Sequence, residues 1–472
     1  MDFVELRSRV LGAAPGLKKI LAAKGALTLF EYQLESLGTV PAISVVRQEE
    51  LLDVISNKVR QIDPGVVPDV LHELRTHYTV STGDHHGPLT HPFSLSGQWS
   101  RLAVLEATRT PVAITLSCGS VSLNNSSFPR GHFFHTRSGK ERRLSFFTLH
   151  NRHHPVYGLP GYRQKELDAF RSEMILTPEM SSQDIGILTE IINTLFAPPQ
   201  ALSFASFAEQ ISYTNYWLWK KIAGQEKTAC LFLDQESIVN ELLVRYHLGQ
   251  STPLDQLLTD TAWHDSFEQF FDGCVGAFSS SDKKGTFLFW ALQDGERKSL
   301  ERQSGALVSR DGRYMVELTS KALVQALIRH ELIPSMALCF IVVSFYYGLR
   351  CGGGFLQVSY LADMKKRYKQ LLETMQAPES ESTITQNVQT DYLAVDFACL
   401  NIQTANGMVG ATSFDFLLYQ DAATAKRLKA LLHSCTLGEA IDQLMPEFYK
   451  IFFHATPQVT VPAKFSPVLY AK

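Results

Sequence analysis

The sequence predicts an α/β fold, with a Rossmann-like parallel sheet core, helical insertions and a smaller C-terminal region. Two observations predict it. An apolar run at 78–81 is followed by a helical pattern at 95–106 and a second apolar run at 112–117, which is the order of a βαβ unit. A third compact apolar run, 228–233, leads into another helical pattern. Ligands of open parallel sheets bind beyond the carboxyl ends of the strands, so the loops after these runs are the first candidates for a site.

The composition is that of a globular protein long enough for two or three domains. Of 472 residues, 45% are hydrophobic and 19% are charged, which allows sizeable cores. A net charge of −3 argues against a protein that binds nucleic acid through overall basicity. The seven cysteines are odd in number and contain no CxxC pair. This pattern favours a reducing compartment and gives no thiolate metal site.

The N-terminus and the apolar segments predict a cytoplasmic protein without a membrane partner. The first residues lack the basic region and apolar run of a signal peptide. The most apolar segment, 336–349, is too short to cross a bilayer and follows Pro334. We therefore expect it to be a buried helix. An oligomer is compatible with these features.

Residues 1–75 predict an N-terminal helical cap. Apolar residues recur at three- and four-residue spacing in 17–23, 27–37 and 49–62, as they do on one face of a helix. Glycine and proline residues separate these segments and mark turns between helices.

The predicted core spans 76–376 and continues after its first loops with a β-hairpin and a helical insertion. Two short apolar runs flank Ser138-Gly139-Lys140, as strands flank a hairpin turn. Residues of about 163–222 predict helices with a break at 197–199. Ser237 is the expected N-cap of a helix at 238–247.

The second half of the core alternates short strands, turns and helices. We expect a helical region at 253–272, strands at 286–292 and 298–308, and helices at 321–331 and 355–368. Gly352-Gly353-Gly354 is expected to end the buried apolar helix and to permit close approach of another backbone.

The last quarter of the chain divides at a polar segment. Residues 377–390 contain few large apolar side chains and predict a flexible linker. Residues 391–472 mix strand and helix patterns and predict a C-terminal α+β region.

Histidine is concentrated in the first third of the sequence, where ten of the fifteen lie between His72 and His154. A metal site is one interpretation, because imidazole is a common neutral ligand. The spacing of His85, His86 and His91 matches no familiar zinc motif, however, and prolines exclude a regular helix there. The alternative is that these side chains bond to backbone groups in loops and at strand ends. We therefore assign no metal ligands.

The loop after the first predicted strand is the first candidate site. It contains Thr82-Gly83-Asp84-His85-His86-Gly87 between a strand and a helix. Gly83 and Gly87 would let the backbone approach a phosphate or carboxylate, while Thr82 and Asp84 would contact the ligand. His85 and His86 would stabilise phosphate charge or act as acid–base groups. The alternative is a tight turn without a ligand.

The loop after the second predicted strand is the second candidate. Asn124 and Asn125 would orient a substrate, and Arg130 is a possible anion clamp that we group with the catalytic candidates. Asn and Ser residues are also common in turns because they tolerate unusual backbone angles, so a purely structural loop is the alternative.

Four segments, in order, resemble the cysteine ligase family of bacillithiol biosynthesis. The family's glycine loop of the form Thr-Gly-Gln-Gln-x-Gly, followed by Gly-Pro-Leu, is similar to TGDHHGPL at 82–89. Its Asp-Gly-x-Arg turn corresponds to Asp294-Gly295-Glu296-Arg297, and its helix ending in Leu-Pro to 332–334. Its Gly-Gly-x-x-Glu-Ile-x-Tyr motif is similar to GGFLQVSY at 353–360, with Gln357 in the place of the glutamate.

The resemblance implies a Rossmann-like core with helical insertions and a nucleotide pocket, for which ATP with Mg²⁺ are the candidate cofactors. It also implies that Gly353, Gln357 and Tyr360 help to bind the ligand, in a pocket shared with the loop at Gly83. The family has an acidic, histidine-containing segment after the second strand, where this sequence has CGSVSLNN at 118–125.

These features lead to one main functional hypothesis. The protein is expected to be a ligase- or transferase-like enzyme that binds a nucleotide or a phosphorylated small metabolite at the carboxyl ends of the sheet strands. Because the acidic segment is missing, a catalytically degenerate, ligand-binding relative is one alternative. A histidine-metal hydrolase is the other.

Overall fold

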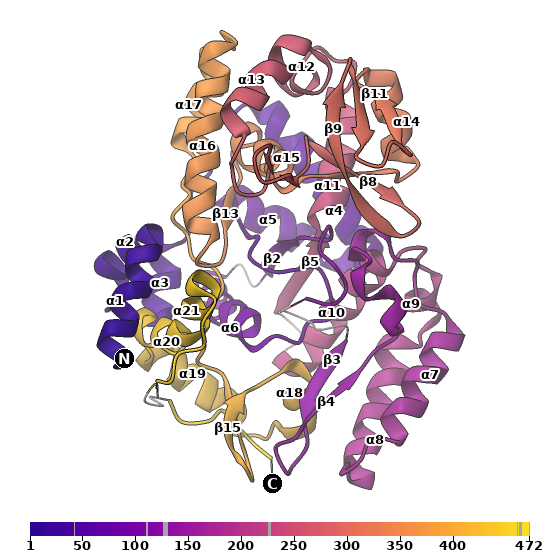
Figure 1. Cartoon of the computed structure of the whole chain (residues 1–472). Coiled ribbons are helices and arrows are strands. Elements are labelled where there is room, and N and C mark those ends of the chain that lie inside the picture. The colour runs from indigo at the N-terminus through magenta and orange to yellow at the C-terminus, as the bar shows by residue number, and fades with distance from the viewer. Residues whose placement is uncertain are drawn as a thin grey trace.

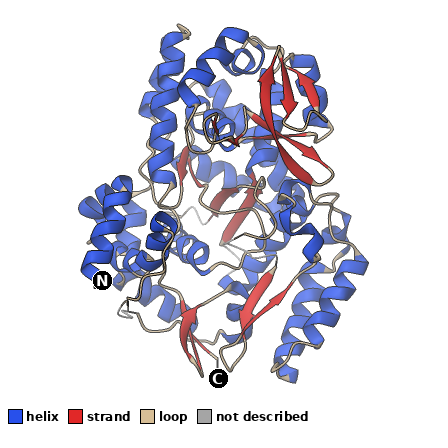
Figure 2. Ribbon diagram, viewed as in Figure 1, coloured by secondary structure: helices blue, strands red, loops and turns tan. Residues whose placement is uncertain are grey.

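The computed structural model describes residues 1–41, 43–109, 112–125, 131–224, 228–459, 461 and 465–471. It shows a mixed α/β protein in which helices predominate around several short sheets (Figures 1 and 2). In the described part of the chain, no helix combines the length and apolar character needed to cross a membrane.

A four-stranded parallel sheet lies at the centre of the molecule (Figure 1). Its strands stand in the order β13 (Arg350–Gly352), β1 (Thr79–Ser81), β2 (Val112–Ser117) and β5 (Ala229–Asp234). The chain therefore fills the sheet in one direction from β1 to β2 to β5, and then returns to the other side of β1 to place β13. The predicted strand at 112–117 is confirmed to the residue, and the other two predicted strands differ by one residue.

The side chains of this sheet alternate between two separate hydrophobic cores. Ala113, Cys230 and Phe232 belong to one core, whereas Ile114 and Leu231 belong to the other. Because successive side chains of a strand point to opposite faces, an apolar strand buried on both faces requires cover on both sides. This explains why β2 and β5 read as uninterrupted apolar runs.

Helices cover both faces. The first core includes α6 (Pro92–Ala107), which links β1 to β2, and much of α10 (Phe207–Ala223), which precedes β5. The second core includes α4 (Val45–Ile62), α5 (Val67–His77) and α11 (Gln235–Leu242). The predicted helical insertion is confirmed: it comprises α7 (Gln164–Ile175), α8 (Ser182–Ile191), α9 (Pro199–Ser203) and α10.

The N-terminal helical segment divides between two parts of the molecule and does not form one cap. The helices α1 (Phe3–Ala13), α2 (Pro15–Lys24) and α3 (Leu29–Glu35) pack against α19 (Thr424–Ser434), α20 (Leu437–Asp442) and α21 (Met445–Phe453), as Figure 1 shows. An ion pair of 2.7 Å between Arg7 and Asp442 joins the two ends of the chain. In contrast, α4 and α5 cover the parallel sheet.

A five-stranded antiparallel sheet lies on the side of the second core. Its order is β11 (Met315–Glu317), β10 (Ala306–Ser309), β9 (Glu296–Gln303), β8 (Phe289–Gln293) and β12 (Leu332–Pro334). The predicted strand at 286–292 begins later, at Phe289, because Leu288 has a positive φ of 55°. The expected helix through Glu331 ends at Ile328 (α14, Ser320–Ile328), since 332–334 pair with β8. The helical region expected at 253–272 is confirmed as α12 (Pro253–Thr259) and α13 (Thr261–Phe271).

The C-terminal region is α+β, as predicted, and shares the first core with the N-terminal helices. It contains the sheet β15 (Gly407–Gly410), β14 (Asn401–Thr404) and β16 (Leu469–Tyr470), together with α18 (Ser413–Tyr419) and α19–α21. The predicted hairpin around Gly139 is confirmed as β3 (His132–His135) and β4 (Glu141–Leu144). A second short hairpin joins β6 (Phe278–Ser279) to β7 (Lys284–Gly285).

The segment expected to be a flexible linker is largely helical, and that prediction is wrong. Its central part forms α17 (Glu379–Asn387), which packs along α16 (Gln357–Thr374). Glu381 is 3% exposed and accepts a hydrogen bond of 3.0 Å from Arg47 Nη1 on α4. Ile384 is buried on the same face of α17. A long-range ion pair and one apolar residue thus stabilise a helix that its own composition does not favour.

The apolar segment at 336–349 is buried, as predicted. It forms α15 (Met336–Phe340) and continues as a π-helical segment, Ile341–Tyr346. The glycines at 352–354 do not end this helix, however. Gly352 is the last residue of β13, so the glycine turn follows a strand of the parallel sheet. This correction places the turn at the carboxyl edge of that sheet.

Candidate functional site

Three loops and one helix leave the carboxyl edge of the parallel sheet, one from each strand. The loops begin at Thr82 after β1, Cys118 after β2 and Gly353 after β13, and α11 begins at Gln235 directly after β5. Because parallel strands end at the same edge, residues that are far apart in the sequence meet there.

The loops after β1 and β13 pack directly on each other, so the glycine segments at 83 and 353 lie together, while the ligand pocket expected between them stays a prediction. The Thr82 amide donates to the Gly352 carbonyl at 2.6 Å, and Gln357 Nε2 donates to Thr82 Oγ1 at 2.6 Å. A Cβ on Gly83 would lie 2.4 Å from Val395 Cγ2 and 3.0 Å from the Gly353 carbonyl carbon. Close packing of two loops therefore explains the glycine at position 83.

His85 and Cys118 are neighbours across the ends of β1 and β2. The Cys118 amide donates to the Asp84 carbonyl at 3.0 Å, and the His86 amide donates to the Cys118 carbonyl at 2.8 Å. This parallel bridge pairs His85 with Cys118 and directs their side chains to the same side of the sheet edge. Both side chains keep partial solvent exposure.

Asn125 orients the His85 ring. The two side chains hydrogen-bond over 3.1 Å between His85 Nδ1 and Asn125 Oδ1. Because an amide oxygen only accepts, Nδ1 carries the proton and Nε2 has the basic lone pair. Burial lowers the pKa of His85, so the neutral ring is the dominant form near neutral pH.

His86 is not part of this cluster. Neighbouring residues of an extended chain point in opposite directions, and the His86 side chain is fully buried against α10. Its Nε2 donates to the Ala208 carbonyl at 2.8 Å, and burial lowers its pKa to about 4. The structure therefore places His86 in the hydrophobic interior as a neutral side chain, and the catalytic role expected for it has no geometric support.

Glu236 lies behind Cys118 and was missed by the sequence analysis. Its carboxylate accepts hydrogen bonds from the Gly119 amide at 2.7 Å, the Ser120 amide at 3.0 Å and the Cys118 thiol at 3.2 Å. Glu236 is 1% exposed, and burial together with Asp234 raises its pKa to about 7. Burial and the adjacent Glu236 raise the pKa of the Cys118 thiol. The thiol and the carboxyl thus form a hydrogen-bonded pair in which both groups have a raised pKa.

The N-cap of α11 also differs from the prediction. Asp234 is the N-cap and accepts from the Ser237 amide at 3.3 Å, while Ser237 lies in the first turn of the helix. The sequence signal that could have identified the site is the acidic pair Asp234-x-Glu236 directly after an apolar strand.

Two further carboxyls complete an acidic edge. Asp84 accepts from the Ser94 hydroxyl at 3.0 Å, and burial raises its pKa to about 7 with a smaller contribution from Asp396. Asp396 accepts from the Phe355 amide at 2.9 Å, and burial raises its pKa to about 6. Protonated carboxyls therefore persist at this edge at a pH where they would ordinarily be ionised.

The remaining expected site residues lie in different environments. Gly87 serves the fold, since its carbonyl accepts from Asn215 Nδ2 at 2.8 Å. Asn124 is exposed, and its amide bonds to the Arg152 carbonyl at 3.1 Å. The Tyr360 hydroxyl donates to Gln357 Oε1 at 3.4 Å, and burial raises the pKa of Tyr360. Arg130 lies outside the described residues.

The described residues of this edge do not form a phosphate cradle. Backbone amides of Gly119 and Ser120 are the groups that would hold an anion at the end of β2, but the Glu236 carboxylate already takes them. Arg297, from the turn expected to matter by resemblance, reaches the same loop and donates to the Ser120 carbonyl at 2.8 Å. Within the described ranges, no three His, Cys, Asp or Glu side chains gather as a metal-binding group.

No family model matches the chain, and no curated protein matches it.

Proposed function

We propose that the protein is a ligase- or transferase-like enzyme that binds a small metabolite at the carboxyl edge of a Rossmann-like parallel sheet. The strand order supports the Rossmann-like assignment, because the chain reverses its direction across the sheet between β1 and β13. In open α/β sheets, the crevice at such a reversal is the usual ligand site. One observation carries the proposal: at the ends of β1 and β2, next to this reversal, His85 and Cys118 lie side by side with the buried Glu236 behind them.

Ligases and transferases need a group that removes a proton from the attacking substrate atom. His85 is suited to this role, since Asn125 holds its Nδ1 proton and leaves Nε2 as the basic nitrogen. Glu236 has a pKa of about 7, near the value at which a carboxyl can both accept and release a proton at neutral pH. It acts through the Cys118 thiol, because Glu236 itself is buried.

The nucleotide and the resemblance to the cysteine ligase family stay predictions. The residues described at the end of β2 do not fit a phosphate group, since the Gly119 and Ser120 amides bind Glu236. No step of the proposed chemistry is therefore assigned to ATP or Mg²⁺. The raised pKa of Cys118 favours one alternative, a ligand-binding relative without catalysis, because a thiol that stays protonated is a poor nucleophile.

A thermal-shift screen tests the proposal. Purified protein is melted with a library of amino acids, sugars, phosphorylated metabolites and nucleotides, the last with and without Mg²⁺. We expect at least one small metabolite to raise the melting temperature of the wild-type protein, because binding to the folded state alone stabilises it. The His85→Ala and Cys118→Ser variants should lose this shift.

The matched control is His72→Ala, which removes an exposed histidine from α5 away from the sheet edge. This variant should keep the full ligand-induced shift. An equal shift in His85→Ala, Cys118→Ser and wild-type protein would exclude this edge as the binding site. Turnover assays with the metabolite that binds then separate the enzyme from the non-catalytic relative.

A further inference from the structure

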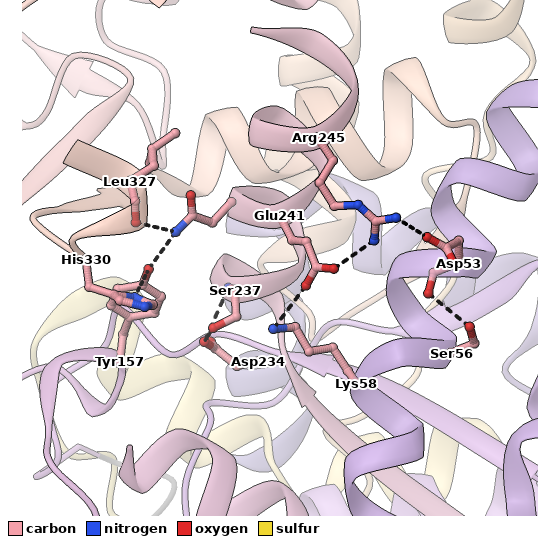
Figure 3. Close-up of polar contacts among 11 residues, drawn as sticks. Asp53, Ser56, Lys58, Tyr157, Asp234, Ser237, Glu241, Arg245, Leu327 and His330 are labelled. Carbon is pink, nitrogen blue, oxygen red and sulfur yellow. Dashed lines mark hydrogen bonds and ion pairs between the residues drawn. The ribbon is translucent and has the colours of Figure 1, made fainter. Parts of the chain in front are cut away.

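Asp234 has one oxygen whose bonding the fold does not explain. Its Oδ2 accepts from the Ser237 amide and the Ser237 hydroxyl at the start of α11 (Figure 3). Its Oδ1 is buried and has no hydrogen-bond partner among the described residues. Asp234 is only 6% exposed, so bulk water has little access to it. A buried carboxylate oxygen without a donor is costly, which calls for a specific explanation.

A proton on Glu236 would supply the missing donor. Both carboxyls crowd around Gly119, because a Cβ added there would lie 2.3 Å from Asp234 Oδ1 and 3.4 Å from Glu236 Oε2. Each carboxyl also shifts the pKa of the other. Two carboxylate oxygens can form a hydrogen bond only when one of them carries a proton. Two neighbouring carboxylates also oppose each other's ionisation.

A small cavity adjoins the same aspartate. Its volume is about 30 Å³, and its walls include Asp234, Ser237, Lys58 and Ser212. About 10–15 Å³ is enough for one water molecule, so the cavity has room for one or two. The Lys58 amino group pairs with Glu241 at 3.2 Å (Figure 3).

We propose that Asp234 and Glu236 share one proton and form a relay between the Cys118 thiol and water in this cavity. In the outward direction, the O–H bond of Glu236 breaks and the proton bonds to Asp234 Oδ1. Asp234 then passes it to a water molecule beside Lys58. The ionised Glu236 accepts the Cys118 proton on Oε1, so the S–H bond breaks as a new O–H bond forms. One proton leaves the thiol and one reaches the solvent, which balances the charge.

Other titratable groups surround the pair and set the field in which it works. Each of them affects the pKa of Asp234 or Glu236, or has its own pKa affected by one of them. They are His85 and His86 from the loop after β1, Tyr157 from the segment before α7, Lys58 from α4 and Cys339 from α15. Burial keeps His85 and His86 neutral near pH 7, so Lys58 is the cation among them. Its position beside Asp234 favours the ionised form of Asp234 and leaves the shared proton on Glu236.

Infrared difference spectroscopy tests the shared proton directly and needs no substrate. At neutral pH, a protonated carboxyl gives a C=O stretching band that ionised carboxylates lack. The wild-type protein should show this band, and Glu236→Gln should lose it. Asp234→Asn should lose the same band, although Glu236 is still present, because Glu236 ionises once its acidic partner is removed. Asparagine is also a good N-cap, so α11 should keep its start.

Asp84→Asn is the matched control, since it removes another buried carboxyl at the same edge. It should remove a different band and leave the band of the pair unchanged. If Asp234→Asn retains the band that Glu236→Gln removes, the proton is not shared and the proposal is wrong. If neither Asp234→Asn nor Glu236→Gln changes the spectrum, both groups are ionised, which also overturns it.

The route through the cavity has its own test. Ser212→Thr adds one methyl group to the cavity wall and keeps the hydroxyl that bonds to the Ala208 carbonyl at 3.1 Å. After transfer to D₂O, the shift of the carboxyl band should be several-fold slower in this variant than in wild-type protein. An unchanged exchange rate would exclude the cavity as the proton route. The relay is located at the proposed active site, but these readouts are spectroscopic, so its failure and the failure of the proposed function are distinguishable.

Discussion

A single methyl group at position 83 tests how the candidate site is assembled. In Gly83→Ala, the new Cβ would lie 2.4 Å from Val395 Cγ2 and 3.0 Å from both the Gly353 carbonyl carbon and the Gly354 nitrogen. The Val395 side chain can move aside, but the two backbone atoms can move only if the loops after β1 and β13 separate. Overpacking of this kind costs about 1–3 kcal/mol. We therefore expect the equilibrium constant for folding to fall by roughly 5- to 150-fold.

The control is the same substitution at a glycine with open space around it. Gly186 lies in the exposed part of α8, and a Cβ there would meet nothing within 4 Å. Gly186→Ala should stabilise the protein by about 0.4–1 kcal/mol, because alanine loses less backbone entropy in a helix. The two variants should thus shift the midpoint of urea denaturation in opposite directions. If Gly83→Ala unfolds at the wild-type midpoint or above it, the close contact between the two loops is not present.

Three further predictions concern the same region and its support. The hydrogen bond between Thr82 and Gln357 should give a coupling energy of about 1 kcal/mol in a double-mutant cycle of Thr82→Val and Gln357→Leu, and additive effects would contradict it. Because burial raises the pKa of Asp84 to about 7 from 3.8, its contribution to stability is complete below about pH 4 and is lost as the pH rises through 7. Asp84→Asn should therefore flatten the decrease in the free energy of unfolding over this pH range, by an amount on the order of a few kcal/mol. An unchanged pH profile of the free energy of unfolding would contradict the assignment. Val343→Asp should cost on the order of 4 kcal/mol in thermal unfolding, since Val343 is fully buried within the second hydrophobic core; a wild-type melting temperature would refute the burial.

Elements that local pattern determines were predicted well. The strand at Val112–Ser117 is buried on both faces, so every residue of it is either apolar or small, and its limits are visible in the sequence. The hairpin around Gly139 and the helices after Gln164 follow from turn residues and apolar spacing in the same way.

Elements that depend on distant partners were not predicted. Only the tertiary fold brings Arg47 to Glu381 and makes α17 a helix. The same holds for the candidate site: His85 and His86 are equivalent in the sequence, and the alternation of the backbone decides that one faces Cys118 while the other faces Ala208. Glu236 contacts Gly119 and Ser120 across more than one hundred residues, so no local pattern could reveal it.

Alkylation of Cys118 is the most direct measurement of whether a metabolite binds at this edge of the sheet. Of the seven cysteines, Cys118 is partly exposed and the other six are buried. The raised pKa keeps the Cys118 thiol protonated, so a small neutral alkylating reagent should label the folded protein slowly and at Cys118 alone. The denatured protein should be labelled quickly at all seven cysteines, as read by mass spectrometry. A metabolite found by the thermal-shift screen should protect Cys118 from labelling at saturating concentration. Full labelling of Cys118 in the presence of that bound metabolite would contradict the proposed site.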